Sequence, residues 1–155
     1  MRILIGVVAA LVATASVATA GPPSVDRFAF EFPYVDTWTC PGTPLDADFA
    51  VQGVDTTFSA TKEQVHLRGV TTFAANGKTV SSNFHVLISI DPTTTVQTIS
   101  GTVYNIQVPG LGTVLLDAGT ITVDVSTNPP TVLHIGGPHQ QFSGDLAALC
   151  TYLGA

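Results

Sequence analysis

An Asn-Gly pair at positions 76 and 77 separates two runs of alternating apolar and polar residues. Asn-Gly is the preferred pair for a two-residue type I′ turn, because both central residues of that turn need positive φ angles. A register shifted by one residue would put the apolar residues of the two runs on opposite faces, so pattern and turn chemistry predict the same hairpin. Its inward pairs would be Val65 with Ile88, Leu67 with Val86, Gly69 with Phe84, and Phe73 with Val80.

The opposite face of this predicted hairpin is polar, and it places Arg68 directly across from His85. One interpretation makes these two residues part of a small polar site. The other makes them part of the solvated outer face of a half-buried sheet, which is the default for antiparallel strands.

Four aromatic residues alternate with other residues ahead of the hairpin: Phe28, Phe30, Phe32 and Tyr34. A period of two predicts a strand with one aromatic face. Pro33 cannot donate to a ladder, so we expect this strand to lie at an edge or to break near that point. The aromatic row is either ordinary core packing or the wall of an apolar ligand pocket.

Further strands are predicted over 46–59, 96–108, 114–125 and 131–135, divided by turns rich in Gly, Pro, Asn and Asp. The 46–59 strand is the weakest of these, 114–125 is interrupted at Gly119, and the last strand resumes near Phe142. About eight short strands with regular turn signals predict an antiparallel β-barrel, with a two-sheet sandwich as the alternative.

The period changes at the C-terminus, where Leu146, Leu149, Cys150 and Leu153 fall at i, i+3, i+4 and i+7. With Asp145 as N-cap, this spacing predicts a short amphipathic helix. Cys150 lies on its buried stripe.

Cys40 and Cys150 are the two cysteines of the chain. In an exported protein such a pair predicts a structural disulfide. A catalytic thiol would instead need a reducing compartment and a nearby base, and the sequence indicates neither. The bridge would tie the C-terminal helix to the end of the aromatic strand.

The N-terminus has the features of a signal peptide: Arg2, an apolar run over 3–12, and a small-x-small pattern ending at Ala20. The rival interpretation is a membrane anchor, but Thr14 and Ser16 dilute the apolar run that an anchor requires. We therefore expect residues 1–20 to be removed and residues 21–155 to form a single β domain that is secreted and extracellular.

The charge of the chain is acidic, with 5 Lys and Arg against 11 Asp and Glu among 155 residues. Loss of the leader removes Arg2 and no acidic residue, which leaves a net charge near −7. Such a surface repels phosphate backbones and anionic lipids. We therefore expect no nucleic-acid partner, and no membrane association after leader removal.

No common catalytic, nucleotide-binding or metal-binding motif is present, so the sequence predicts no catalytic residue, cofactor or metal ligand. His134 and His139 match no common zinc spacing. Together with Asp124 they could form a metal site. The alternative is two loop histidines beside the end of a strand.

The latter two-thirds of the chain resembles a family of small secreted bacterial β-barrel proteins of unknown function. The motifs that carry the resemblance are Cys40-Pro41, the hairpin from Val65 to Val80, Pro109-Gly110-Leu111, Ala118 to Val123, and the closing Asp145 to Cys150. The resemblance implies a barrel and brings no catalytic residues with it.

Three functional hypotheses follow. The first is non-catalytic binding of a small apolar ligand or of an extracellular protein, based on the aromatic row. The second is an exported enzyme using Arg68 and His85, which is less favoured because only their adjacency supports it. The third is a structural or cell-surface interaction module, which the sequence does not separate from the first.

Overall fold

The computed structural model describes residues 22–139 and 146–154, and within these stretches the chain forms seven strands and one helix. The predicted leader and the predicted strand near Phe142 lie outside the described residues. The N-cap of the C-terminal helix is Leu146, so the prediction of Asp145 as N-cap is wrong by one residue. The elements are β1 (Ser24–Asp36), β2 (Leu45–Ser59), β3 (Lys62–Ala75), β4 (Lys78–Ile90), β5 (Val96–Val108), β6 (Gly112–Asp124), β7 (Thr131–Gly136) and α3 (Ala147–Leu153).

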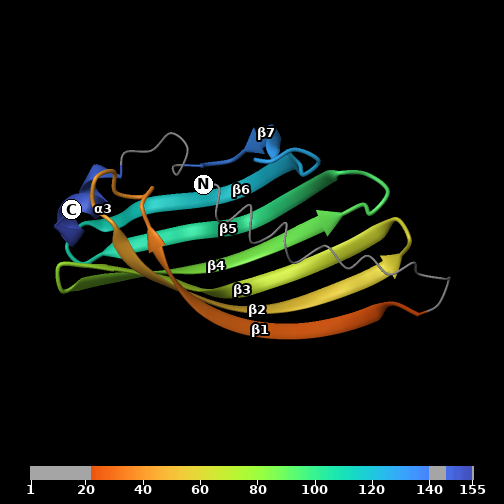
Figure 1. Cartoon of the computed structure of the whole chain (residues 1–155), viewed down its shortest axis with the longest axis horizontal. Helices are drawn as coiled ribbons and strands as arrows, with labels where there is room; N and C mark the ends of the chain where they lie inside the picture. The colour runs from red at the N-terminus through yellow and green to blue at the C-terminus, as the bar shows by residue number, and fades with distance from the viewer. Residues whose placement is uncertain (1–21, 140–145, 155) are drawn as a thin grey trace.

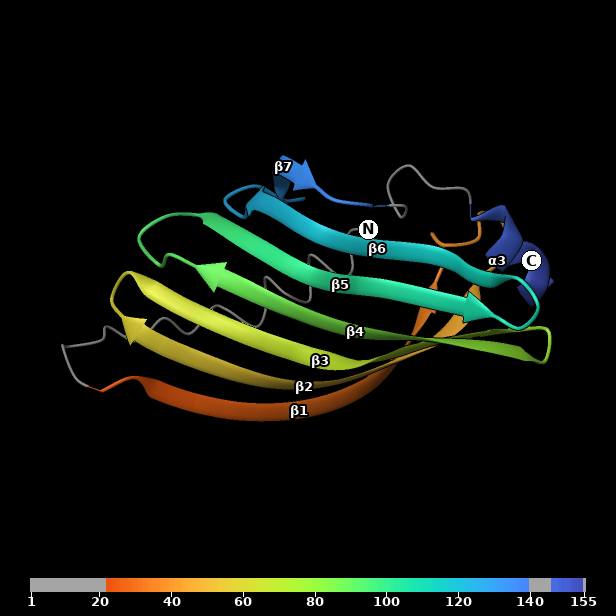
Figure 2. The same ribbon diagram turned by 180° about the vertical axis from the view of Figure 1, so that it is seen from behind.

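All seven strands belong to one antiparallel sheet in which each strand pairs with the next along the chain. Figures 1 and 2 show the strands side by side in this order as one curved layer. The all-β class and the short C-terminal helix are therefore confirmed. β1 and β7 are the two edges, and no ladder joins them in the described part of the chain, so the sheet is not closed there into a barrel.

The strand count differs from the prediction because β6 runs through Gly119 without a break. Gly119 lies directly opposite Gly101, and both glycines take positive φ angles, 135° and 129°. A Cβ on Gly119 would come within 2.1 Å of the Gly136 carbonyl oxygen on β7. The absence of a side chain at Gly119 thus lets β6 lie close to both β5 and β7. The glycine therefore permits continuous pairing where a strand break was predicted.

The predicted hairpin is confirmed residue by residue. Val65 pairs with Ile88 and Gly69 with Phe84, and the turn residues Asn76 and Gly77 have φ angles of 51° and 74°. The Phe84 ring occupies the space that a Cβ on Gly69 would need. A large ring that covers a cross-strand glycine fills the gap and pins the register.

The inner face of the sheet carries two groups of buried side chains. The helix-side core lies at the α3 end, and its buried members are Cys40, Leu45, Ala47, Phe73, Val80, Tyr104, Ile106, Val108, Leu115, Leu149 and Leu153. The aromatic core lies on β2, β3 and β4, and its buried members are Phe49, Val51, Val65, Leu67, Phe84, Val86, Ile88 and Ile90. Of the described elements, those outside the sheet contribute to the first group and not to the second.

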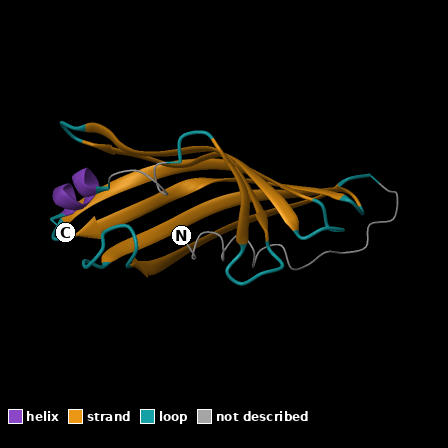
Figure 3. Ribbon diagram, turned by 90° about the horizontal axis from the view of Figure 1, so that it is seen from above, coloured by secondary structure: helices purple, strands orange, loops and turns teal. Residues whose placement is uncertain are grey.

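Helix α3 has the buried stripe that the spacing predicts, since Leu149 and Leu153 are both 0% exposed. Figure 3 shows the helix at one end of the sheet. Cys150 forms the predicted disulfide with Cys40, with an S–S distance of 2.09 Å and a Cα–Cα distance of 5.5 Å. Two turns of helix are marginal on their own, so these contacts hold it in place.

Two polar side chains complete the attachment of the helix. The buried Asp36 carboxylate accepts hydrogen bonds from the Trp38 and Thr39 amides at 2.7 and 2.8 Å, which orders the loop before Cys40. Asn76 Nδ2 donates to the carbonyl oxygens of Leu153 and Gly154 at 3.1 and 2.8 Å. The hairpin turn is therefore also the partner of the C-terminal end of the helix.

Reduction of the disulfide should loosen α3 before the central hairpin. The bridge joins the helix to the β1–β2 loop, and in the chain-entropy model a loop of this size is worth up to about 4–5 kcal/mol. Hydrogen exchange with and without reductant should show earlier loss of protection at Leu149 than at Val86. Equal loss at both amides would show that the bridge stabilises the whole sheet.

Replacement of Asn76 with glycine should weaken the helix while preserving the turn. Glycine accepts the positive φ angle but cannot donate to Leu153 and Gly154, a loss of about 1 kcal/mol per hydrogen bond. We expect hydrogen exchange to rise in α3 and to stay unchanged in β3 and β4. Asn76→Asp also keeps a residue that forms such turns but lacks the Nδ2 donor, so it should raise hydrogen exchange in α3 in the same way. Unchanged protection of α3 in both variants would show that Asn76 does not hold the helix end.

Candidate functional site

The aromatic row on β1 lies on the inner face of the sheet and is continuous with the aromatic core. Phe28, Phe30 and Phe32 stack in sequence, with ring centroids 6.1 and 5.9 Å apart. Phe32 contacts Phe49 at 5.4 Å, and Phe49 stacks on Phe84 at 5.0 Å. The expected aromatic face is thus present, and it spans four strands as one surface.

The first ring of the row covers a second glycine. Phe28 pairs with Gly53 on β2, and its ring occupies the place of a Cβ there. Phe28, Phe30 and Phe32 stay only partly buried, because β1 is an edge strand and has a neighbour on one side. This edge position agrees with the expectation from Pro33.

Tyr34 ends the row on the side of the helix, where it packs against both cores. Burial, followed by the nearby charge of Asp36, raises the pKa of its phenol to about 12. The hydroxyl therefore stays protonated at neutral pH and can donate a hydrogen bond at this end of the aromatic row.

Three carboxyl groups gather at the other end of the inner face. Asp26 pairs directly with Asp55, and Glu63 enters the same face from β3. Burial raises the pKa of Asp55, and the charge of Asp26 adds to this. Burial also raises the pKa of Glu63, helped by the charge of Asp55 and by a hydrogen bond between the two side chains.

This acidic group was not among the predicted site residues. Its signal is that Asp55 and Glu63 fall in phase with apolar inward positions such as Val51, Val65 and Leu67. An acid in the apolar phase of a strand must find a partner on the buried face. Extending the alternation of inward and outward residues through the β2–β3 turn would have predicted that the two carboxyl groups lie close together.

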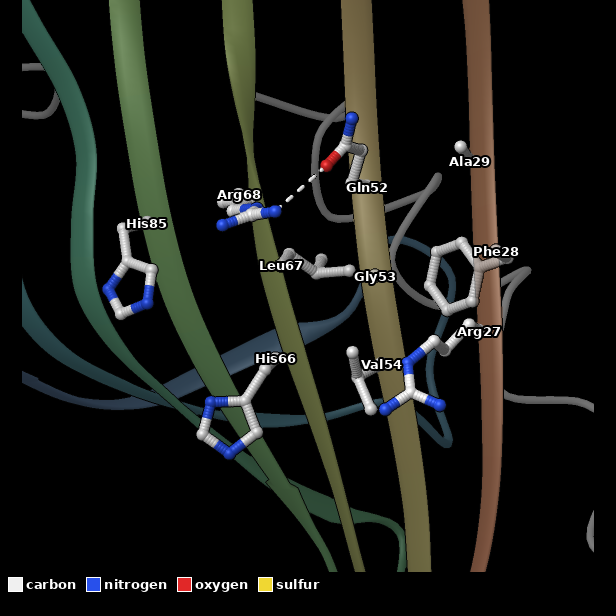
Figure 4. A pocket seen from close by; sticks show the side chains of 10 residues that line it. All are labelled: Arg27, Phe28, Ala29, Gln52, Gly53, Val54, His66, Leu67, Arg68 and His85. Atoms are coloured by element: carbon white, nitrogen blue, oxygen red, sulfur yellow. Dashed lines mark hydrogen bonds between the residues drawn. The ribbon is translucent and has the colours of Figure 1, made fainter.

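The outer face of the sheet brings together Arg68 and His85, which pair directly as predicted. They border a hollow of about 660 Å³, which is also lined by Arg27, Gln52, Val54 and His66. Figure 4 shows how these side chains lie. Arg68 donates to Gln52 Oε1 at 3.1 Å. A second hollow of about 650 Å³ continues over the same face and is bordered by Glu31 and Asn83.

The histidines near the C-terminus do not assemble as a site. His139 is buried, with Nδ1 2.5 Å from Asp117 Oδ1 and Nε2 3.1 Å from the Gly136 carbonyl oxygen. His134 is exposed on β7, and Asp124 Oδ1 accepts from the Ser126 amide at 2.9 Å. Within 22–139 and 146–154, no three His, Cys, Asp or Glu side chains are grouped as metal ligands would be.

The expectation of two loop histidines is wrong for His134, which lies within β7, while His139 lies after the strand as expected but is held there by Asp117. It forms an isolated bridge with Asp117, and the two side chains are a buried pair that fastens the segment after β7 to β6. The signal was Asp117, an acid in the inward phase next to Leu115. A buried acid there needs a donor from elsewhere in the chain.

Comparisons of the chain with protein-family models, with curated proteins and with solved structures found no match. Among the described residues, α3 is too short to span a membrane. The functional conclusion therefore depends on the two faces of the sheet.

The Asp55–Glu63 pair should make folding stability depend on pH. The folded-state pKa of Glu63 is raised, so the folded chain holds its proton at pH values where the unfolded chain has lost it. The free energy of unfolding is highest below the unfolded-state pKa of about 4.3. It falls as the pH rises through the raised folded-state pKa. Glu63→Gln should remove this loss and raise the Tm at pH 7, because glutamine has the same shape and carries no charge at this buried position.

Thermal unfolding at pH 5 and pH 7 provides the measurement. Glu31→Gln is the matched control, because Glu31 is exposed on the outer face of β1. The difference in Tm between the two pH values should shrink in Glu63→Gln and persist in the control. Equal pH dependence in Glu63→Gln and the unsubstituted protein would mean that the pair does not titrate as described.

Proposed function

We propose that the protein is an exported, non-catalytic binding protein and that the inner face of its sheet takes an elongated apolar ligand along the aromatic row. The observation that carries this proposal is the aromatic core. Among the described residues, its buried members and the partly buried side chains packed against them come from β1 to β5, whereas α3 and the Cys40 loop pack over the helix-side core. A ligand would supply the missing layer.

The energetic argument starts from the usual behaviour of sheets. An antiparallel sheet buries its apolar face against a second element, because apolar area removed from water contributes about 25 cal/mol per Å². Phe28, Phe30 and Phe32 keep part of their surface accessible on that face. An apolar ligand lying along β1 would cover the rest of these rings.

The ends of the row give such a ligand a direction. The neutral Tyr34 hydroxyl lies toward the helix, and the acidic group of Asp26, Asp55 and Glu63 lies at the other end. Carboxylates near that end disfavour an anionic headgroup and favour a neutral or cationic one. The ligand class that fits best is therefore a long apolar molecule without a negative charge at the acidic end.

Export rests on the predicted signal peptide, and the disulfide supports it, since such bonds persist in oxidising compartments. We also keep as part of this proposal that the sheet closes into the barrel predicted from the sequence, or that it packs as one layer of a two-sheet sandwich. Either arrangement would complete the wall around the aromatic core. We likewise propose that the chain is related to the small secreted bacterial β-barrel proteins that it resembles.

Catalysis by Arg68 and His85 stays the less favoured alternative. Their adjacency is its support, and the other polar residues around their hollow are Arg27, Gln52 and His66. None of these is an activated nucleophile or a general acid of the carboxyl type. This set of side chains is better suited to binding than to bond breaking.

A neutral fluorescent probe such as Nile red tests the binding proposal on the exported protein. Phe30→Thr keeps a residue that favours strands while removing the central ring of the row. We expect its probe affinity to fall about tenfold, which corresponds to about 1.4 kcal/mol of lost aromatic contact. Phe32→Thr should behave in the same way.

Glu31→Thr is the control, because residue 31 lies between these two rings on β1 but faces the other side of the sheet. Its probe affinity should match that of the unsubstituted protein. Absence of probe binding would sink the small-ligand proposal and leave a macromolecular partner as the alternative. Equal losses in all three variants would place the probe elsewhere.

A further inference from the structure

The outer face of the sheet gathers cationic side chains in two neighbouring cross-strand rows. One row runs from Arg27 on β1 across Val54 on β2 to His66 on β3. The next runs from Ala29 across Gln52 to Arg68 and His85. The hollow of about 660 Å³ forms where the short side chains of Ala29 and Val54 lie between the longer ones.

The charge of this hollow is opposite to that of the chain as a whole. Arg27 and Arg68 are two of the four Lys and Arg residues that follow position 20, and 11 acidic residues accompany them. None of the residues that line the hollow is acidic, and Glu31 borders the adjoining hollow. Two arginines and two histidines thus share one small surface.

Neither arginine is neutralised within the described part of the chain. The one ion pair found there joins His139 to Asp117, far along β6 from this surface. Arg68 donates to the neutral Gln52 amide, and Figure 4 shows Arg27 extending from β1 over Val54. A guanidinium carries five donor hydrogens, so both groups keep donors for an external acceptor.

We propose that this hollow binds a small polyvalent oxyanion, a molecule with two or more carboxylate or phosphate groups. Arg27 and Arg68 lie on β1 and β3 and in neighbouring cross-strand rows. The usual spacings within a sheet place their Cα atoms about 12 Å apart. Both side chains are long and flexible, so their guanidinium groups can converge from two strands on one ligand with more than one acidic group. The ring nitrogens of His66 and His85, which also line the hollow, can add hydrogen bonds to it.

The overall negative charge does not prevent such binding. At physiological salt the Debye length is about 8 Å, so distant carboxylates are largely screened while groups around the hollow act at contact. The same screening favours a small anion over a long anionic polymer, which would extend past the hollow onto acidic surface. Affinity should fall as ionic strength rises.

Titration calorimetry of the exported protein with pyrophosphate, citrate and acetate tests the site. Pyrophosphate and citrate distinguish phosphate from carboxylate recognition, and acetate tests the need for more than one acidic group. We expect at least one of the polyvalent anions to bind and acetate to bind at least tenfold more weakly. Arg27→Gln and Arg68→Gln should each lower the affinity at least tenfold.

Lys62→Gln is the matched control, since it removes the same charge from β3 at a residue that contacts Phe58 outside the hollow. It should leave the affinity unchanged. Equal weakening in Lys62→Gln and the arginine variants would show that net charge alone attracts the anion and would overturn the site. Absence of binding by both polyvalent anions would overturn it as well.

Discussion

The apolar inner face of a single antiparallel sheet has to be kept from water, and the arrangement of this chain follows from that requirement. At one end of the sheet the chain covers the face itself, because Leu149 and Leu153 of α3 pack there and the disulfide anchors the helix to the β1–β2 loop. Asn76 adds a polar attachment from the hairpin turn. The aromatic core at the other end has no such cover among the described elements, and this difference motivates the ligand proposal.

Much of the fold could be predicted because its signals are local. The Asn76-Gly77 turn fixes a register that repeats along the whole hairpin, and the spacing from Leu146 to Leu153 identifies the helix. The weakest predicted strand proved to be one of the longest, since β2 runs from Leu45 to Ser59. Its interior Gly53 lowers strand propensity, and only tertiary contact with the Phe28 ring compensates for it.

The remaining features depend on contacts that local patterns do not contain. Whether Gly119 breaks a strand depends on the approach of Gly136, and the partner of Asp117 comes from beyond β7. The pairing of Arg68 with His85 followed from the hairpin register, but the contribution of Arg27 required the registers of β1 and β2 as well. The sequence therefore predicted the pairing of two of the four basic residues around the outer hollow. It did not predict the acidic group on the inner face.

The central claim is that the two parts of the inner face differ in role: the helix-side core closes the fold and the aromatic core receives a ligand. Intermolecular NOEs between a neutral medium-chain alcohol such as 1-decanol and the protein side chains test it most directly. The account predicts contacts to the ring protons of Phe28, Phe30 and Phe32, and none to the methyl groups of Ile106, Leu149 and Leu153. Contacts confined to the second set, or absent from both, would contradict it.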